Sequence, residues 1–413
     1  MSKKTGRAPR FLALDFFCGA GGATCGLIDA GGYVCAGIDN DVRNEMTYVK
    51  NNRNRFGDLR SPLFLLRNMM PVDANGRDGQ LEEVRDECRG IVRRSREHWS
   101  GVPLVFVICA PCQPFTRLSH KSMTVQRLEK RRRDSELLPA TAQLIKWFKP
   151  EVVICENVAG ITSERYGGVW QQFRARLHEL GYGTSSEVIC ASRFGVPQFR
   201  RRRVLMAFSA LAMQRANISA MPPVPTCDPR AEVVTVRDAI SRFPPIRAGE
   251  SHLTVPNHRA RALAPQNQRR LRASSPGKSN ERLAHDVTAA LALPCHLNLA
   301  DRDGSWGFSD VYTRMDPDRP APTITTKSHS VSNGRFGHYD ERQLRALSPR
   351  EAAALQAFPD DYIFYPTHMI EPATRMIGNA VPPLLMKCLA DYALDIFEST
   401  VKVTEAMNER AAN

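Results

Sequence analysis

A strand-like run, a glycine-rich turn and a helix open this chain, and this order constrains most strongly what it can fold into. Residues 11–17 are apolar except for Asp15, and they lead into Cys18-Gly19-Ala20-Gly21-Gly22 and a helical stretch. The next strand ends on Asp39, twenty residues after Gly19. In a nucleotide-type βαβ unit, glycines allow close backbone approach, the helix amino terminus faces the ligand, and an acid on the second strand holds a ribose diol. The sequence therefore predicts such a unit here.

The glycine pattern narrows the ligand. It reads Gly-x-Gly-Gly and not Gly-x-Gly-x-x-Gly, so a dinucleotide with a pyrophosphate is not the expected ligand. Asp15 precedes the first glycine by four residues and suits a ligand with a cationic or amino-acid group, such as S-adenosylmethionine. A plain glycine-rich turn is the competing interpretation of this stretch taken alone.

Strand-like and helical stretches go on alternating to residue 208. Such alternation is typical of an α/β fold with a doubly wound, mostly parallel sheet, which we predict for residues 1–210. Further strands are expected at 63–66, 105–108, 150–155, 187–190 and 204–208, and helices at 81–98, 137–148 and 170–180. Residues 116–135 are rich in arginine and lysine without apolar periodicity, which predicts a long basic loop. This loop is either a lid that covers a phosphate backbone or a run of charged side chains that is simply exposed to solvent.

The composition changes after residue 210. Residues 211–340 are rich in proline, arginine and histidine and lack sustained periodicity, so we predict a smaller, irregular, basic domain. Residues 341–413 regain order, with helices expected at 344–358 and 380–397, and we predict that they return to the first domain.

Charge and cysteine usage limit the class of protein. The net charge is +14 and the pI about 9.5, which favours a nucleic-acid partner over a merely basic, solvated surface. No apolar run approaches the ~20 residues of a membrane helix, so we expect a cytosolic protein that does not use a membrane. The eleven cysteines predict reduced core residues, and no second Cys-x-x-Cys or paired histidine indicates a metal site.

One thiol stands out. Cys112 follows the strand-like run 105–108 and lies in a Pro111-Cys112-Gln113-Pro114 turn. Open α/β sheets place their chemistry at the carboxyl ends of strands, so we predict that Cys112 is a nucleophile. A redox pair with Cys109 is the weaker alternative, since nothing downstream resembles a thioredoxin unit.

A carboxyl group follows the next strand. Glu156 ends the run 150–155, and a buried acid one strand from a thiol suits attack on an electron-poor ring, because the acid makes the ring more electrophilic. Further along, Gln198, Arg200 and Arg202 alternate, which predicts both arginines on one face of an extended segment.

Six segments in this order resemble the bacterial DNA (cytosine-5) methyltransferases along nearly the whole chain. They are Asp15 to Gly22, Pro111-Cys112-Gln113, Glu156-Asn157-Val158, Gln198-x-Arg200-x-Arg202, Arg345 to Pro359, and Gly378 to Pro382. The resemblance implies a Rossmann-like, S-adenosylmethionine-dependent catalytic domain, with 211–340 as a target-recognition domain.

The resemblance also implies roles. Cys112 matches the nucleophile that adds to carbon 6 of cytosine, Glu156 the acid that hydrogen-bonds the ring, and Arg202, with its neighbour Arg200, the catalytic arginine motif that contacts the flipped base. The residues implied to bind the cofactor are Asp15, Phe17, Gly19, Gly21, Asp39, Pro111 and Asn379. Those implied to bind substrate are Gln113, Asn157, Gln198, Thr323 and Thr325. No metal is implied.

The expected partners are double-stranded DNA, from which the base is flipped, and a cognate restriction endonuclease; we expect a monomer. Three alternatives stand beside this interpretation: a tRNA cytosine methyltransferase, a catalytically silent DNA-binding regulator and a nicotinamide oxidoreductase. The resemblance also implies an acid after the third strand that binds the adenine amino group of the cofactor. Three residues are candidates for it, Asp58, Asn68 and Asp73, and we leave this site unassigned.

Overall fold

The computed structural model describes residues 8–56, 62–70, 79–111, 125–163, 167–280, 291 and 309–412. The chain divides into two compact units. The sheet unit comprises Met1–Cys190, Arg201–Pro229 and Pro383–Asn413, and the irregular unit comprises Ala191–Arg200 and Arg230–Pro382. The functional division at residues 210 and 340 stays a prediction, although residues 341–382 pack with the irregular unit.

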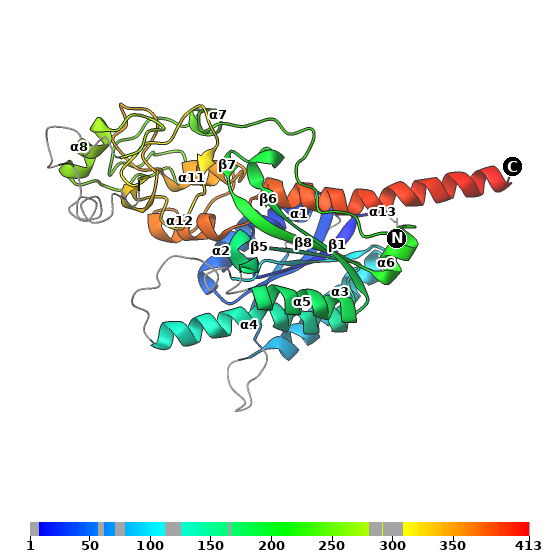
Figure 1. Cartoon of the computed structure of the whole chain (residues 1–413). Coiled ribbons are helices and arrows are strands. Elements are labelled where there is room, and N and C mark those ends of the chain that lie inside the picture. The colour runs from blue at the N-terminus through cyan, green and yellow to red at the C-terminus, as the bar shows by residue number, and fades with distance from the viewer. Residues whose placement is uncertain are drawn as a thin grey trace, which may run out of the picture. The chain divides into compact units, whose positions relative to one another are not determined.

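The sheet unit contains a seven-stranded sheet in the order β3-β2-β1-β4-β5-β8-β6 (Figure 1). Its strands are β1 (Phe11–Phe16), β2 (Gly32–Asp39), β3 (Leu63–Leu66), β4 (Leu104–Ile108), β5 (Val152–Val158), β6 (Tyr182–Cys190) and β8 (Arg201–Ser209). The first five run parallel, and β8 runs antiparallel to both β5 and β6. This confirms the predicted α/β, mostly parallel sheet.

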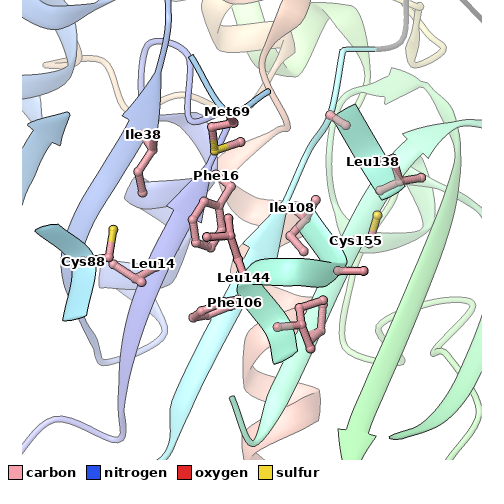
Figure 2. Packing of buried hydrophobic residues seen from close by; sticks show 14 of the residues in the cluster. Leu14, Phe16, Ile38, Met69, Cys88, Phe106, Ile108, Leu138, Leu144 and Cys155 are labelled. Atoms are coloured by element: carbon pink, nitrogen blue, oxygen red, sulfur yellow. The ribbon is translucent and has the colours of Figure 1, made fainter. Parts of the chain in front are cut away.

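The centre of the sheet is buried on both faces, which explains its nearly continuous apolar strands. All residues of β1 and β4 are buried, and the rings of Phe16 and Phe106 meet edge-on with centroids 4.9 Å apart. Figure 2 shows both rings in the same cluster as Leu138 and Leu144 of α4 (Val125–Phe148). Burying such a side chain contributes about 1.5–3 kcal/mol. The core therefore fixes the strands whose ends carry the site.

Helices cover both faces of this sheet. On one face lie α1 (Gly22–Asp29) and α13 (Pro383–Ala412), and on the other lie α3 (Leu81–His98), α4 and α5 (Gly167–Glu179) (Figure 1). The unit also holds α2 (Glu45–Asn51) and α6 (Ala210–Arg215). None of the helices in the described part of the chain is long and apolar enough to cross a membrane.

The first and last helices of the sheet unit pack closely at one glycine. A Cβ on Gly26 would lie 2.2 Å from the carbonyl oxygen of Pro383, so no larger residue fits without moving α13. Arg10 adds ion pairs to three acids of α13, Asp391, Asp395 and Glu398, which share one helix face by their spacing.

The prediction of a long basic loop over 116–135 is wrong from residue 125 onward, because α4 begins at Val125. Residues 125–135 are dominated by arginine, lysine, glutamate, glutamine and leucine, which have high intrinsic helix propensity even without an apolar stripe. Residues 116–124 lie outside the described part of the chain.

The irregular unit has little regular structure. Its described elements are η4 (Ala191–Phe194), β7 (Gln198–Phe199), α7 (Val236–Ile240), α8 (Pro265–Ala273), β9 (Ala321–Pro322), η6 (Val331–Asn333), α11 (Pro349–Leu355) and α12 (Ile370–Asn379). The helix predicted at 344–358 is shorter, because Ser348 and Glu351 form a capping box at its start. The helix predicted from 380 begins at Pro383, and α12 was not predicted.

Buried arginines connect the loops of this unit. Arg314 is fully buried and donates to the carbonyls of Leu271, Ser274 and His338, among others. Arg345 is also buried and forms a two-bond ion pair with Glu351 at 2.7 Å. Since irregular backbone leaves carbonyl groups without ladder partners, guanidinium groups satisfy them inside the protein.

Candidate active site

The site lies at the point in the sheet where successive strands begin to be added on the opposite side. The strand order runs β1, β2, β3 to one side and β4, β5 to the other, so the carboxyl ends of β1 and β4 flank a topological switch point, where open α/β sheets bind ligands. The loop after β4 is described as far as Pro111. The predicted residues Cys112 and Gln113 lie outside the described residues, so their surroundings are defined by the strand ends beside them.

The exit of the chain from β4 is fixed on both sides. The N–H of Cys109 donates to the carbonyl of Phe16 at the end of β1, at 3.3 Å. The side-chain N–H of Asn157 donates to the carbonyl of Ala110 at 3.1 Å, and its oxygen accepts from the N–H of Val158 at 2.9 Å. Asn157 is fully buried. Its amide therefore positions the start of the loop, while its role in binding substrate stays a prediction.

Cys109, predicted as a core residue, is half-buried directly after β4. Burial raises the pKa of its thiol well above the usual value, and the nearby charge of Glu156 adds to this effect. A thiol that stays protonated is a poor nucleophile, so this environment does not favour a redox pair with Cys112.

Glu156 and Arg202 form the polar centre of the site. Because β5 and β8 run antiparallel with Glu156 opposite Val204 and Val158 opposite Arg202, the two charged side chains meet diagonally across the strands. Arg202 Nε lies 2.8 Å from Glu156 Oε1, and only 12% and 9% of the two side chains are exposed. This pair lacks hydrogen-bond geometry, so Oε1 is buried with no hydrogen-bond donor among the described residues.

We predicted Glu156 at the end of its strand. It lies inside the strand, because β5 continues to Val158. The pairing of β5 with β8 continues past the apolar run 150–155 to Val158. The sequence of β5 alone does not reveal this pairing. The carboxyl group is consequently held by two strands.

Arg200 and Arg202 belong to different units, so their sharing of one face stays a prediction. The chain leaves the small β7–β9 ladder after Phe199 and enters β8 at Arg201, so Arg200 lies between two different sheets. Arg200 is buried and donates to the carbonyls of Ile324, Gly378 and Ala380 at 3.1–3.3 Å. It therefore links three segments of the irregular unit.

Gln198 has a similar environment. It is fully buried, donates to Leu355 O (3.1 Å) and Gln356 Oε1 (2.9 Å), and accepts from the N–H of Ile324 (2.8 Å). These bonds leave its amide engaged with protein groups. A direct contact of Gln198 with substrate stays a prediction.

The predicted threonines and Asn379 also lie in the irregular unit. Thr323 donates to the carbonyl of Phe199 at 2.8 Å, and Thr325 is exposed. Gly378 approaches this segment so closely that a Cβ on it would lie 2.3 Å from the N–H nitrogen of Thr326. Asn379, next to this contact, is exposed. The unit thus brings two of the predicted motifs together.

In the sheet unit, the glycine-rich turn after β1 has an unusual backbone. Phe17, Gly19 and Gly21 have φ angles of 61°, 54° and 93°, and a left-handed phenylalanine is a strained conformation. Asp39 holds this turn in place, since its carboxylate accepts from the N–H of Gly19 at 2.9 Å and also from that of Asp41 at 2.8 Å.

The turn has the features of a binding loop for a small cofactor. A Cβ at Gly19 would meet nothing within 4 Å, and helix α1 begins at Gly22 with no side-chain cap on its first N–H groups. Open space beside a glycine and uncapped N–H groups suit close approach of an anionic group such as a carboxylate. The residues present therefore fit the predicted cofactor.

Asp15 lies beneath this turn and is fully buried. Its Oδ2 accepts from Thr24 at 2.7 Å, and Thr24 also contacts the hydroxyl of Tyr48 at 3.1 Å. Burial raises the pKa of Asp15 to about 7, against the hydrogen bond from Thr24, and the charge of Asp39 raises it further. Sequence reasoning missed Thr24 and Tyr48, although a polar residue inside an apolar helical stretch is the available signal.

The acid expected after the third strand stays unassigned. The side-chain oxygen of Asn68, two residues beyond β3, accepts from the N–H of Met70 at 3.2 Å. Asp58 and Asp73 lie outside the described residues. Within the described residues, no group of three or more histidine, cysteine or acidic side chains could hold a metal ion.

Residues 99–394 match the model of the C-5 cytosine-specific DNA methylase family, which is more than half of the chain. The chain belongs to this family. It is a DNA (cytosine-5-)-methyltransferase, which confirms the predicted family and reaction and excludes the nicotinamide oxidoreductase.

Curated relatives of this methyltransferase support the assignment over its whole length. It is 33% identical to the type II methylase M.HgiDII of Herpetosiphon aurantiacus over 399 residues, covering 96% of this chain and 97% of that protein. It is 30% identical to the type II methyltransferase M1.HphI of Haemophilus parahaemolyticus, covering 69% of this chain and 66% of that protein.

Solved structures show the same fold at low sequence identity. A candidate DNA modification methyltransferase encoded within a prophage (E. coli) gives a TM-score of 0.63 at 18% identity, covering 95% of this chain and 99% of that one. The S. pombe Dnmt2 methyltransferase gives 0.54 at 14% identity, covering 94% and 98%.

Proposed function

We propose that this methyltransferase transfers a methyl group from S-adenosylmethionine to carbon 5 of a flipped cytosine in a specific duplex sequence, through a covalent bond to Cys112. The observation that carries the proposal is the buried Glu156–Arg202 pair between β5 and β8, whose Glu156 Oε1 has no hydrogen-bond donor among the described residues. A buried carboxyl oxygen of this kind suits a polar ligand that enters the site.

The proposed reaction uses the thiol and the acid together. The Cys112 thiolate adds to carbon 6 of the ring, while Glu156 in its acid form donates to nitrogen 3 and its other oxygen accepts from the amino group. Electron density then collects on carbon 5, which takes the methyl group. Loss of the carbon 5 proton to solvent or a nearby base restores the 5,6 double bond and expels the thiolate.

Two further residues orient these groups. Arg202 pairs with Glu156 across the β5–β8 ladder, and we propose that it also contacts the base. Asn157 fixes the carbonyl of Ala110, so the loop that bears Cys112 leaves the sheet in one direction. Positioning of this kind contributes to rate because the reacting atoms are already aligned.

S-adenosylmethionine would supply, when bound, an electrophilic methyl group on a sulfonium centre; the S–CH3 bond breaks in the transfer and the donor leaves as the neutral thioether. The turn of Phe17, Gly19 and Gly21 would receive its amino-acid end, and Asp39 retains carboxylate lone pairs for a ribose hydroxyl. The buried carboxyl of Asp15 would, when ionised, place a group of opposite charge beneath a cationic ligand. Pro111 and Asn379 are proposed as further contacts.

The DNA partner is expected from the family, and its target sequence is proposed to be read by residues 211–340, most of which lie in the irregular unit. The target carbon is stacked inside a duplex, so the base must be flipped out. Because M.HgiDII and M1.HphI are named as type II enzymes, we also propose a companion restriction endonuclease that cuts the same site and is blocked by the methyl group.

The central test traps the covalent intermediate. A duplex with 5-fluorocytosine at the target, found by bisulfite sequencing of DNA from expressing cells, should form a stable adduct, because fluorine cannot leave as a proton does. Cys112→Ala should form none, and Cys109→Ala, the matched control, should still form it. An adduct with Cys112→Ala, or its loss only with Cys109→Ala, would refute the assignment.

The acid is tested separately. Glu156→Gln keeps the shape of the side chain but cannot supply the proton, so we expect turnover to fall by about 10²–10⁴-fold, the usual range for general acid–base groups. A near-normal rate would remove Glu156 from the mechanism. The companion enzyme is tested by digestion: DNA methylated by this protein should resist an endonuclease encoded beside it, and full cleavage would contradict the pairing.

A further inference from the structure

An aromatic and a cationic side chain form an exposed pair on the irregular unit. The guanidinium carbon of Arg319 lies 5.7 Å from the ring centroid of Phe199, a cation–π distance. The ring is 43% exposed, which is high for a phenylalanine, and Arg319 is exposed as well. Neither residue was predicted as part of a site.

Hydrogen bonds hold both residues on rigid backbone. Phe199 pairs with Pro322 in the β7–β9 ladder, and its carbonyl accepts from Thr323 at 2.8 Å. The carbonyl of Arg319 accepts from the N–H of Val236 at 2.9 Å. The exposed pair is therefore presented at a fixed place.

Phe199 is exposed, whereas its two neighbours in the chain are buried. The flanking side chains of Gln198 and Arg200 point inward and bond to protein groups, so alternation along the strand turns Phe199 outward. The ring of Phe199 therefore contributes less to the stability of the fold than a core phenylalanine, and its exposed face is accessible to a partner.

The charge of Arg319 is not neutralised by a neighbouring acid. The adjacent Asp318 pairs with Arg237 at 3.0 Å, and no carboxylate in the described part of the chain forms an ion pair with Arg319. A guanidinium with only a ring beside it can bind a phosphate bidentately, and arginine is well suited to phosphate recognition.

The position along the chain relates this pair to the target base. Phe199 is three residues from Arg202, which pairs with Glu156, and three extended residues span about 10 Å at most. Since neighbouring base pairs are separated by about 3.4 Å, such a distance corresponds to roughly three base-pair steps. A ring there can reach the nucleotides that flank the flipped cytosine.

We propose that Phe199 and Arg319 form a contact for the DNA beside the target cytosine, in which the ring packs on a flanking sugar or base and Arg319 binds a phosphate. This rests on the proposed role of Arg202 and adds two positioning residues that no sequence motif marked. Bases and sugars offer flat or apolar faces to an aromatic ring, and such stacking tolerates sequence change. The pair should therefore set affinity and register more than target choice.

The test measures the KM for a duplex carrying the target, the KM for S-adenosylmethionine and kcat at several salt concentrations. Phe199→Ala should raise the KM for DNA about 5- to 150-fold, the range for loss of one stacking contact, with kcat and the cofactor KM nearly unchanged. Phe199→Trp should restore most of the affinity. Arg319→Gln should lower the slope of log affinity against log salt by about 0.9, the value for one phosphate contact.

Arg342→Gln serves as the matched control. Arg342 is an exposed arginine of the same unit, but it already pairs with Asp340 at 3.0 Å, so its loss should leave DNA affinity and slope unchanged. Unfolding midpoints confirm that each variant is folded, and if Phe199→Ala does not fold, the Arg319→Gln slope decides. A wild-type slope with Arg319→Gln, or DNA KM values within twofold of wild type in both variants, would overturn the proposal. Wild-type protein that methylates no DNA would instead refute the proposed function.

Discussion

Asn157 offers a sharp test of how the sheet positions the catalytic loop. Its side chain is completely buried and makes two hydrogen bonds, one to the carbonyl of Ala110 and one from the N–H of Val158. Asn157→Ala would leave both backbone groups without these partners, and each such loss costs about 1–3 kcal/mol. We therefore expect a fall in the free energy of unfolding of about 2–6 kcal/mol, the sum of the two losses.

A larger effect should fall on turnover. Without the Ala110 contact, the loop that starts at Pro111 loses its anchor on β5, and a displacement of about 1 Å at a reacting atom can cost 10²-fold in rate. We expect kcat to fall by about that factor, while the KM for S-adenosylmethionine changes little. Asn157→Asp keeps an acceptor for Val158 but removes the donor for Ala110 and buries a carboxyl group, so it should reproduce at least this loss.

Asn54→Ala is the matched control. Asn54 also bonds to two backbone groups, the N–H and the carbonyl of Val34, both at 2.9 Å, but it lies at β2 and not at the loop. It should lose stability to a comparable degree, measured by denaturant unfolding, and keep its kcat. Equal loss of kcat in Asn157→Ala and Asn54→Ala, or normal turnover in folded Asn157→Ala, would refute the reasoning.

Two further perturbations test the packing and the charge beneath the cofactor turn. Gly26→Ala places a Cβ 2.2 Å from Pro383 O, where 3.4 Å is the ordinary limit, so α13 must move by about 1.2 Å (3.4 − 2.2); this should destabilise the protein by about 1–3 kcal/mol. Gly90→Ala, the same change inside α3, meets only a flexible arginine at 3.4 Å and should stabilise by about 1 kcal/mol; equal effects in thermal unfolding would contradict this. Burial raises the pKa of Asp15 from 3.8 to about 7, so protonated Asp15 stabilises the fold. This contribution to the free energy of unfolding is complete below pH 3.8 and is lost as the pH rises through about 7. Asp15→Asn should therefore gain stability relative to wild type between pH 4 and 8, whereas parallel pH curves would show that Asp15 does not titrate in this way.

Much of the sheet could be predicted from local sequence. The runs that became β1 and β4 are apolar because both faces of the sheet are covered, so their position follows from composition alone. The switch point then follows from strand order, and with it the importance of the thiol and acid nearby. β6 was longer than predicted because its first residues, Tyr182 to Ser186, are mostly polar or small.

The role of Arg200 could not be predicted in the same way. Its partners are the carbonyls of Ile324, Gly378 and Ala380, between 124 and 180 residues away. Backbone carbonyls carry no side-chain signal, so no pattern around Arg200 marks them. Alternation with Arg202 predicts a shared face, and the chain passes from one ladder to another between Phe199 and Arg201.

The start of α4 was missed for a different reason. Its first turns contain strong helix formers without an apolar stripe, and periodicity is the signal on which the loop prediction depended. Propensity summed over the segment would have favoured a helix.

The close contact of α1 with α13 also bears on how the protein is made. Gly26 and Pro383 are 357 residues apart (383 − 26), and at about 5–20 residues per second a ribosome needs roughly 20–70 s to synthesise that length. During this time α1, which carries the cofactor turn at its start, lacks the helix that covers it. Nascent chains should therefore acquire cofactor affinity only after α13 has left the ribosome, so that incomplete products stay inactive.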